Sequence, residues 1–221
     1  MATFTFSSKA DVAYAQIREQ ILSGRLGAGS KLDQYELAAS MGMSITPLRE
    51  AVRRLSGEGL VLLDNHRNAK VAQMDEAEAR QLFEARLALE PAALALAAQR
   101  RTEGDIERMN AALEKLLPVT REQGEPALVV HRELHEALYT ASHNPVMTKM
   151  LNDLWDRSDR YRRVGLALPP GGEPRLQDFE EHQRLVELVV QGEAEAAERL
   201  MAEHIANSLT AAALADYQEQ P

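Results

Sequence analysis

The sequence predicts a mainly α-helical protein of two domains: an N-terminal winged helix-turn-helix over residues 1–72 and a C-terminal antiparallel bundle of six helices over residues 73–221. Two observations predict this. Near the N-terminus, short helical patterns joined at Gly42 are followed by two apolar runs of strand length. Beyond residue 72 the composition changes to Ala, Leu, Glu and Arg, and each segment carries an apolar stripe that neighbouring helices must cover.

The composition limits the class of protein. The 221 residues suit two small domains, and a hydrophobic content of 45% allows each domain to bury a core. The chain has no cysteine, which excludes disulfides and thiolate metal sites. Residues 1–9 lack the apolar core of a signal peptide, and no apolar run approaches the roughly 18 residues of a membrane helix. We therefore expect a cytoplasmic protein without membrane segments.

The first two elements are expected to be short helices. Residues 10–24 carry apolar side chains at helical spacing and end in a glycine. After a glycine-rich turn, residues 32–43 form the second expected helix, which Gly42 closes. Two helices joined by a glycine turn form the outline of a helix-turn-helix.

The third helix is expected to begin at Ser44, because a capping Ser followed by Pro47 in the first turn is a strong signal for a helix start. At 3.6 residues per turn, one face is apolar and the other carries Thr46, Arg49 and Arg53. Such a helix packs on a small core and presents hydroxyl and guanidinium groups to an anion. The arginines alone would also suit a solvated surface helix.

A β-hairpin is expected next. Residues 60–64 and 69–72 are short apolar runs, and they flank a tip that contains His66 and Arg67. The capped helix, the helix before it, the glycine turn and the basic hairpin together favour a winged helix-turn-helix that binds DNA.

Residues 10–72 resemble the DNA-binding domain of GntR-type transcriptional regulators. Residues 21–26 resemble the family motif I-L-x-G-x-L, and residues 37–44 resemble L-A-x-x-L-G-V-S. Residues 45–51 resemble R-T-P-V-R-E-A, but Ile45 replaces the first Arg, which removes one expected phosphate or base contact.

The resemblance implies which side chains face DNA. Helical spacing adds Arg53 to them. A two-fold dimer of such domains would read a short inverted repeat in double-stranded DNA. The positions implied by the resemblance are Tyr35, Ser44, Thr46, Arg49, His66 and Arg67.

The net charge of −9 is unevenly distributed between the two expected domains. Residues 1–72 carry 9 Lys and Arg against 7 Asp and Glu, whereas the remainder carries 16 against 27. A small positive domain can still bind a specific DNA site, but we expect weak nonspecific affinity and binding that weakens with salt.

Residues 73–221 are expected to form helices throughout. Their breaks are marked by Gly, Pro and Asn residues. The expected helices cover residues 75–101, 104–121, 125–142, 145–165, 174–191 and 193–216.

Four histidines on three of these helices, His131, His135, His182 and His204, point toward the core of the bundle. A lone inward histidine is usually a hydrogen-bonded core residue. Four buried imidazoles together favour a metal site, because burying poorly satisfied rings is costly. Arg132 occupies the place of the catalytic Glu of zinc proteases, and no histidine has Glu three residues before it, so an enzyme is disfavoured.

Residues 75–216 resemble the FCD ligand-binding domain of the FadR branch of GntR regulators, and the six helices resemble its VanR-like subgroup. Residues 82–91 resemble the opening helix R-x-x-L-E-P, and residues 131–145 resemble D-x-x-F-H followed by A-S-G-N-P. The motifs E-H and H-I/L of the family resemble residues 181–182 and 204–205.

The resemblance implies a divalent metal held by one Asp and three His, and His131 stands where Asp is usual. An all-imidazole site would keep the full charge of the ion and prefer zinc, nickel or cobalt to manganese. His131 could also be left out of the site, which would leave three histidine ligands.

Arg86 lies on an inward face and has two interpretations. It could form a structural ion pair with Glu90, or it could bind the carboxylate of a small effector, as the resemblance implies. We expect a homodimeric repressor that responds to a small carboxylate such as a sugar acid or hydroxy acid. The alternatives are a structural metal, a sensor of the metal itself or, least favoured, a metal-dependent enzyme.

Two further expectations concern the fourth helix of the bundle. Trp155 is expected to pack rather than to contact a cofactor. The arginines at positions 157, 160, 162 and 163 are expected to form a solvated or inter-subunit face.

Overall fold

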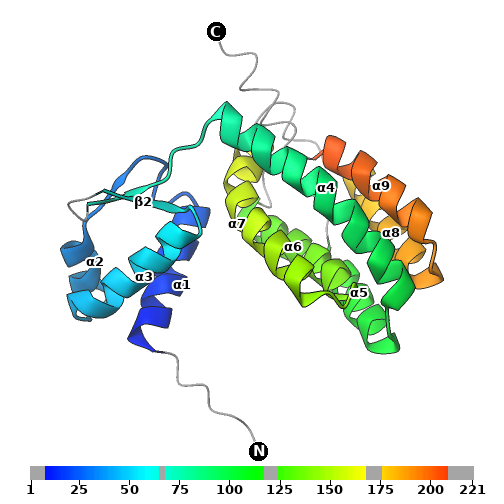
Figure 1. The fold of residues 1–221 in the computed structure, drawn as a ribbon, viewed down its shortest axis with the longest axis horizontal. Helices are drawn as coiled ribbons and strands as arrows, with labels where there is room; N and C mark the ends of the chain where they lie inside the picture. Colours follow the sequence, from blue (N-terminus) through cyan, green and yellow to red (C-terminus); the bar gives the residue numbers. More distant parts are fainter. Residues whose placement is uncertain (1–7, 65–67, 117–123, 168–175, 209–221) are drawn as a thin grey trace, which may run out of the picture. The chain divides into compact units, whose positions relative to one another are not determined.

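The computed structural model describes residues 8–64, 68–116, 124–167 and 176–208. The chain divides into two compact units, Met1–Met74 and Asp75–Pro221. Figure 1 shows a unit of helices with a small sheet and a unit of helices alone. The winged helix-turn-helix and the helical bundle expected from the sequence are both confirmed.

The first unit contains three helices and one small sheet within its described residues. Its strands lie in the order β1-β3-β2, and both pairings are antiparallel, with Val61 opposite Val71. The hairpin of β2 and β3 was expected, but β1 was not, because two residues are too short to show a strand pattern. The elements are α1 (Lys9–Leu22), β1 (Lys31–Leu32), α2 (Gln34–Ser40), α3 (Ile45–Gly57), β2 (Val61–Leu63) and β3 (Ala69–Val71).

The apolar face of α3 lies in the core of the first unit. Leu48, Val52 and Leu55 are at most 1% exposed, and they pack with Ile17 and Ile21 of α1. The opposite face of α3 therefore remains at the surface. Ser44 is the N-cap residue in backbone conformation, but its side chain makes no capping hydrogen bond, unlike the cap expected from the sequence.

The second unit contains six helices in its described residues. Figure 1 shows α4 running along the bundle beside α9, and these two helices are in extensive contact. The helices are α4 (Glu76–Arg100), α5 (Glu103–Lys115), α6 (Gly124–Thr140), α7 (Pro145–Ala167), α8 (Leu176–Gln191) and α9 (Ala194–Ala206).

Two of these helices, α5 and α9, end well before the expected residue. Helix α5 ends at Lys115, where Leu116 becomes extended. A helix that continued to residue 121 would hold Pro118 in its interior, where the proline ring clashes with the carbonyl four residues earlier. Helix α9 ends at Ala206, where Asn207 caps it, rather than continuing to residue 216. Residues 117–121 and 209–216 of the expected helices lie outside the described residues.

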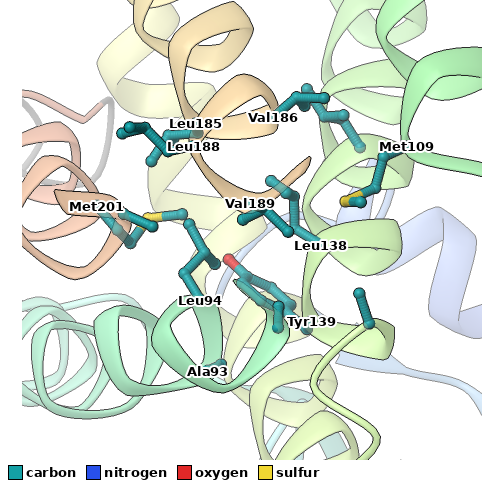
Figure 2. Close-up of a cluster of buried hydrophobic side chains, with 14 of the residues drawn as sticks. Ala93, Leu94, Met109, Leu138, Tyr139, Leu185, Val186, Leu188, Val189 and Met201 are labelled. Atoms are coloured by element: carbon teal, nitrogen blue, oxygen red, sulfur yellow. The ribbon is translucent and has the colours of Figure 1, made fainter. Parts of the chain in front are cut away.

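The core of the second unit joins all six of its described helices. Figure 2 shows Leu94 of α4, Met109 of α5, Leu138 of α6, Val189 of α8 and Met201 of α9 gathered around one centre, and all five are fully buried. Leu151 of α7 belongs to the same cluster. This packing fixes the inner faces of α6, α8 and α9, which carry the four histidines.

Candidate metal centre and nucleic-acid interface

The outer face of α3 presents polar side chains at the surface. Thr46, Ser44 and Arg53 are exposed, and Arg49 is partly buried beside Tyr35 of α2. The Nη2 of Arg49 donates a hydrogen bond of 3.3 Å to the hydroxyl of Tyr35, whose side chain is 69% exposed. The structure therefore brings five of the seven expected DNA-facing residues to one surface.

A hollow of about 80 Å³ lies on this surface, and the guanidinium of Arg49 is at its wall. The buried Nε of Arg49 has no hydrogen-bond partner among the described residues. A buried donor without a partner is costly, so this atom is available to an acceptor such as a phosphate or a base edge. The hollow is lined by Gln34, Arg49, Val52, Arg53, Leu63 and Asp64.

Ile45 packs partly buried against the core of the first unit. This position is where the GntR resemblance leads one to expect Arg. An apolar side chain that contributes to the core cannot also contact a phosphate, which accounts for the departure in structural terms.

The tip of the hairpin includes His66 and Arg67, and both lie outside the described residues. Asp64 and Asn68, on either side of the tip, are joined by two hydrogen bonds. The Oδ1 of Asp64 accepts a hydrogen bond of 2.8 Å from the backbone N–H of Asn68, and its Oδ2 accepts one of 2.8 Å from Nδ2 of the same residue. Asp64 and Asn68 thus close the ends of β2 and β3.

The four histidines meet inside the second unit. His131 and His135 come from α6, His182 from α8 and His204 from α9, and none is more than 6% exposed. One ring nitrogen from each lies within 4.8 Å of those of the other three. The structure thus brings the four expected metal ligands together.

His135 is held by a buried network that reaches α4 and α7. Its Nδ1 lies 2.8 Å from the hydroxyl of Tyr139, which donates a 2.7 Å hydrogen bond to Oε2 of Glu90. The indole N–H of Trp155 donates to both Glu90 and Tyr139, at 3.1 Å each. Because the hydroxyl proton is committed to Glu90, the hydroxyl oxygen accepts the proton of His135 Nδ1.

His182 and His204 are held in the same way, each by an acceptor on α8. The Nδ1 of His182 donates to the backbone carbonyl of Asp178. The Nδ1 of His204 donates to Oε2 of Glu181 at 2.8 Å, and this hydrogen bond lowers the pKa of Glu181. A carbonyl and a carboxylate can only accept, so in both histidines the proton is on Nδ1.

Three imidazoles therefore keep a lone pair on Nε2. Burial lowers the pKa of His135 well below 6.5 and that of His182 to about 4, so both rings are neutral near pH 7. Their Nε2 atoms are only 2.9 Å apart. Two lone pairs at that separation repel unless a cation lies between them, and two nitrogens on one zinc are about 3.4 Å apart in tetrahedral geometry. The donor set fits a divalent metal that accepts nitrogen ligands.

His131 has different surroundings. Its Nδ1 lies 2.8 Å from Nη2 of Arg162, and its Nε2 lies 3.9 Å from Oδ2 of Asp178. Burial and the charge of Arg162 lower the pKa of His131 well below 6.5. The ring is therefore neutral and close to a fixed positive charge.

Two of the four arginines of α7, Arg160 and Arg162, are buried and so do not form the solvated face that was one expectation. Arg157 and Arg163 are partly exposed, and the inter-subunit alternative stays a prediction. Arg162 is 2% exposed and Arg160 is 5% exposed. Arg162 donates a 2.6 Å hydrogen bond to Oδ1 of Asp159 and lies over the ring of Trp155, 4.6 Å from its centroid. A buried guanidinium is tolerated when carboxylates and aromatic faces compensate its desolvation, which the sequence pattern of α7 alone does not reveal.

Arg86 forms the ion pair with Glu90 that was one of its two interpretations. Its Nε donates to Oε1 of Glu90 at 2.5 Å, and the side chain is 2% exposed. Its guanidinium also lies 4.6 Å from the centroid of Trp155. Trp155 packs as expected, and it contacts the histidine cluster, with its ring centroid 4.6 Å from that of His135.

The sequence did not predict most of the groups that orient the histidines. Two of these partners lie four residues from their histidine on the same helix: Tyr139 follows His135, and Asp178 precedes His182. Residues four apart are neighbours on a helix, so the spacing could have predicted both contacts. Arg162 and Glu181 act across helices, and their roles require the fold.

The two units match two known protein families. Residues 9–71 match "Bacterial regulatory proteins, gntR family", and residues 81–207 match the "FCD domain".

In the described part of the chain, no helix has the length and apolar character to span a membrane.

Similar proteins share nearly the full length of the chain. The HTH-type transcriptional regulator LutR of Bacillus subtilis is 30% identical over 85% of this chain and 93% of its own. The HTH-type transcriptional repressor GlaR of Escherichia coli is 27% identical over 87% and 90%. The solved structure of E. coli McbR/YncC superposes with a TM-score of 0.80 at 25% identity, covering 96% of this chain and 99% of that one.

Proposed function

Since the chain belongs to the gntR family of bacterial regulatory proteins, carries an FCD domain and is a DNA-binding transcriptional regulator, we propose that it is a repressor controlled by a small ligand. The ligand is a small carboxylate, such as a hydroxy acid or sugar acid, and it binds at a metal ion in the second unit. GlaR, which is named a transcriptional repressor, is similar over most of both chains, and this similarity supports repression rather than activation.

The candidate ligands of the metal are His131, His135, His182 and His204. The observation that carries the metal proposal is the 2.9 Å approach of two neutral, buried Nε2 atoms whose Nδ1 protons are already used. Zinc is the ion we favour, with nickel or cobalt as alternatives, because imidazole suits all three. A bound ion of this kind supplies a Lewis acid whose open positions accept an anionic oxygen.

The side chains around the cluster favour an anionic ligand. The cluster lies near two buried guanidiniums, those of Arg86 and Arg162, and both contact Trp155. Arg86 is already paired with Glu90. To bind the effector as well, its guanidinium must have N–H donors left for the carboxylate of the effector. A guanidinium has five N–H donors, which is enough for both partners.

DNA recognition is proposed for Tyr35, Ser44, Thr46, Arg49 and Arg53, together with His66 and Arg67 at the hairpin tip. A homodimer would place two copies of α3 in successive major grooves of a short inverted repeat. Binding of the effector would change the relative position of the two copies of α3, so that they no longer fit the operator and the DNA is released.

A second candidate function is a metal site that is structural or that senses the metal itself. The burial of all four histidines favours it, since none is more than 6% exposed and closed sites are typical of structural metals. In that case removal of metal alone would alter folding or DNA binding, and no organic ligand would be needed.

A thermal-shift screen of small carboxylates separates these functions. The protein is tested with its metal and after chelation, because a ligand that binds only the folded state raises the melting temperature. A carboxylate that stabilises only the metal-loaded protein supports the effector proposal. A melting temperature that responds to metal and to no carboxylate supports the structural or metal-sensing function instead.

A further inference from the structure

We infer that His131 does not bind the metal, and that the ion is held by three imidazoles, those of His135, His182 and His204. Arg162 keeps His131 in the tautomer whose Nε2 carries the proton. This inference rests on the proposed metal site and specifies its ligands.

The first argument is the contact between Arg162 and His131. Nη2 of Arg162 lies 2.8 Å from Nδ1 of His131, within hydrogen-bond distance. A guanidinium has only donors, so Nδ1 of His131 must accept. In a neutral imidazole the proton is then on Nε2, which leaves that nitrogen without a lone pair for a metal.

The second argument is the carboxylate of Asp178. Its Oδ2 lies 3.9 Å from Nε2 of His131. A lone pair on Nε2 would be repelled by this negative charge, whereas an N–H is attracted to it. Groups on both sides of the ring, on two different helices, thus favour the same tautomer.

The third argument is the contrast with the other three histidines. In each of them Nδ1 faces an acceptor: the hydroxyl oxygen of Tyr139, the carbonyl of Asp178 or the carboxylate of Glu181. Metal-binding histidines typically donate their second N–H to such a partner, which fixes the tautomer that binds the ion. His131 is the one ring of the four with a cation at that position.

Three neutral imidazoles leave the full charge of a divalent ion uncompensated. They also leave at least one coordination position open, as in zinc sites with three protein ligands. The exchange of the usual Asp for His131 thus removes a ligand rather than replacing one.

The tautomer is read directly from the zinc-loaded protein with 15N-labelled histidine. Long-range 1H–15N correlations distinguish a protonated Nδ1 from a protonated Nε2 in each ring. We expect three rings with Nδ1 protonated and Nε2 bound to zinc, and one ring, His131, with Nε2 protonated. His131→Asn identifies the signal, because it removes one ring and keeps an acceptor for Arg162.

Zinc titration of the chelated full-length protein provides the second readout. His131→Asn should keep one zinc per chain with an affinity at most about 10-fold below that of the wild type, which is the lower end of the cost of losing an outer partner. The matched variant His135→Asn removes a ligand and should weaken binding by more than about 100-fold. Circular dichroism checks that both variants are folded.

The outcomes separate this inference from the function on which it rests. Four rings with zinc on Nε2, or equal losses of zinc affinity in His131→Asn and His135→Asn, would overturn the inference and leave the metal site standing. A wild-type protein that binds no zinc, nickel or cobalt would overturn both.

Discussion

At the scale of single residues, the hydroxyl of Tyr139 connects the proposed metal site to the rest of the bundle. It accepts from His135 and Trp155 and donates to Glu90, which is also paired with Arg86. Every polar atom of this network is buried, so each hydrogen bond removed leaves a group without a partner. The network orients His135 from α4 and α7 at once.

Replacing Tyr139 with Phe should weaken zinc binding by about 10- to 100-fold, because His135 loses the acceptor that fixes its tautomer. The metal-free protein should also lose about 1–3 kcal/mol of unfolding free energy, since buried donors are left unsatisfied. Zinc titration and urea unfolding measure the two effects. Tyr14→Phe is the matched control, because the hydroxyl of Tyr14 bonds Glu58 in the first unit, 2.9 Å away. Equal zinc affinities in both variants would contradict the role of Tyr139.

The buried histidines should make the metal-free protein sensitive to acid. Burial holds the pKa of His182 at about 4 and those of His131 and His135 well below 6.5. The unfolded chain binds protons at these groups near pH 6.5 and the folded chain does not, so stability is full above that pH and falls as the pH drops toward 4.

Urea unfolding of the chelated protein at pH 7.5, 6.5 and 5.5 tests this prediction. Each such histidine contributes a slope of up to about 1.4 kcal/mol per pH unit. His182→Asn should flatten the slope between pH 6.5 and 5.5. An unfolding free energy that rises on acidification through this range would show that the rings are charged in the folded state.

At the scale of elements, one face of α3 lies in the core and the other is the face that we propose to bind DNA. Its apolar face is buried with α1, and its outer face carries Thr46, Arg49 and Arg53. Of these residues, Arg49 is the best positioned for a specific contact, because Tyr35 supports its guanidinium and its buried Nε is without a partner among the described residues.

Arg49→Ala should weaken binding to a specific operator by about 1–3 kcal/mol, as expected for loss of a guanidinium contact. The operator is obtained by selecting bound duplexes from random DNA with the wild-type protein, and affinity is measured by fluorescence anisotropy. Arg18→Ala on α1 is the control and should have little effect. If Arg18→Ala lowered operator affinity as much as Arg49→Ala does, α3 would not be the specific DNA-binding surface.

Elements with many apolar contacts were predictable from the sequence, and their ends were less so. The stripe of Leu48, Val52 and Leu55 predicted α3, and periodicity placed all six helices of the bundle. Helix α5 ends early because a proline follows its last turn, and strand β1 exists only because β3 pairs with it. Local patterns carry no information on such long-range pairing.

Helical periodicity also made the histidine cluster predictable from the sequence. The residues that hydrogen-bond to these histidines were only partly predictable. Helical spacing points four rings inward, but nothing in the spacing shows that Arg162 crosses to His131. Burying that arginine requires Asp159 and Trp155 on its own helix, and only the folded bundle shows that they compensate its charge.

At the scale of the whole molecule, the chain combines a slightly basic first unit with an acidic second one. Residues 1–72 carry a net charge of +2 and the remaining residues −11, which together give −9. Nonspecific DNA affinity should therefore be low, and operator affinity should decrease with salt in proportion to the phosphates contacted. In the proposed homodimer, specific binding would depend on two copies that bind together, and the proposed effector would need only a modest change in free energy to oppose it.

The most direct test of the proposed function measures operator affinity by anisotropy while a carboxylate found in the thermal-shift screen is added. The zinc-loaded protein and its chelated form are compared. We predict that the carboxylate weakens operator binding by about 5- to 150-fold in the zinc-loaded protein, a coupling of about 1–3 kcal/mol, and has no effect after chelation. An equal effect in both forms, or none in the zinc-loaded protein, would contradict metal-dependent control by the effector.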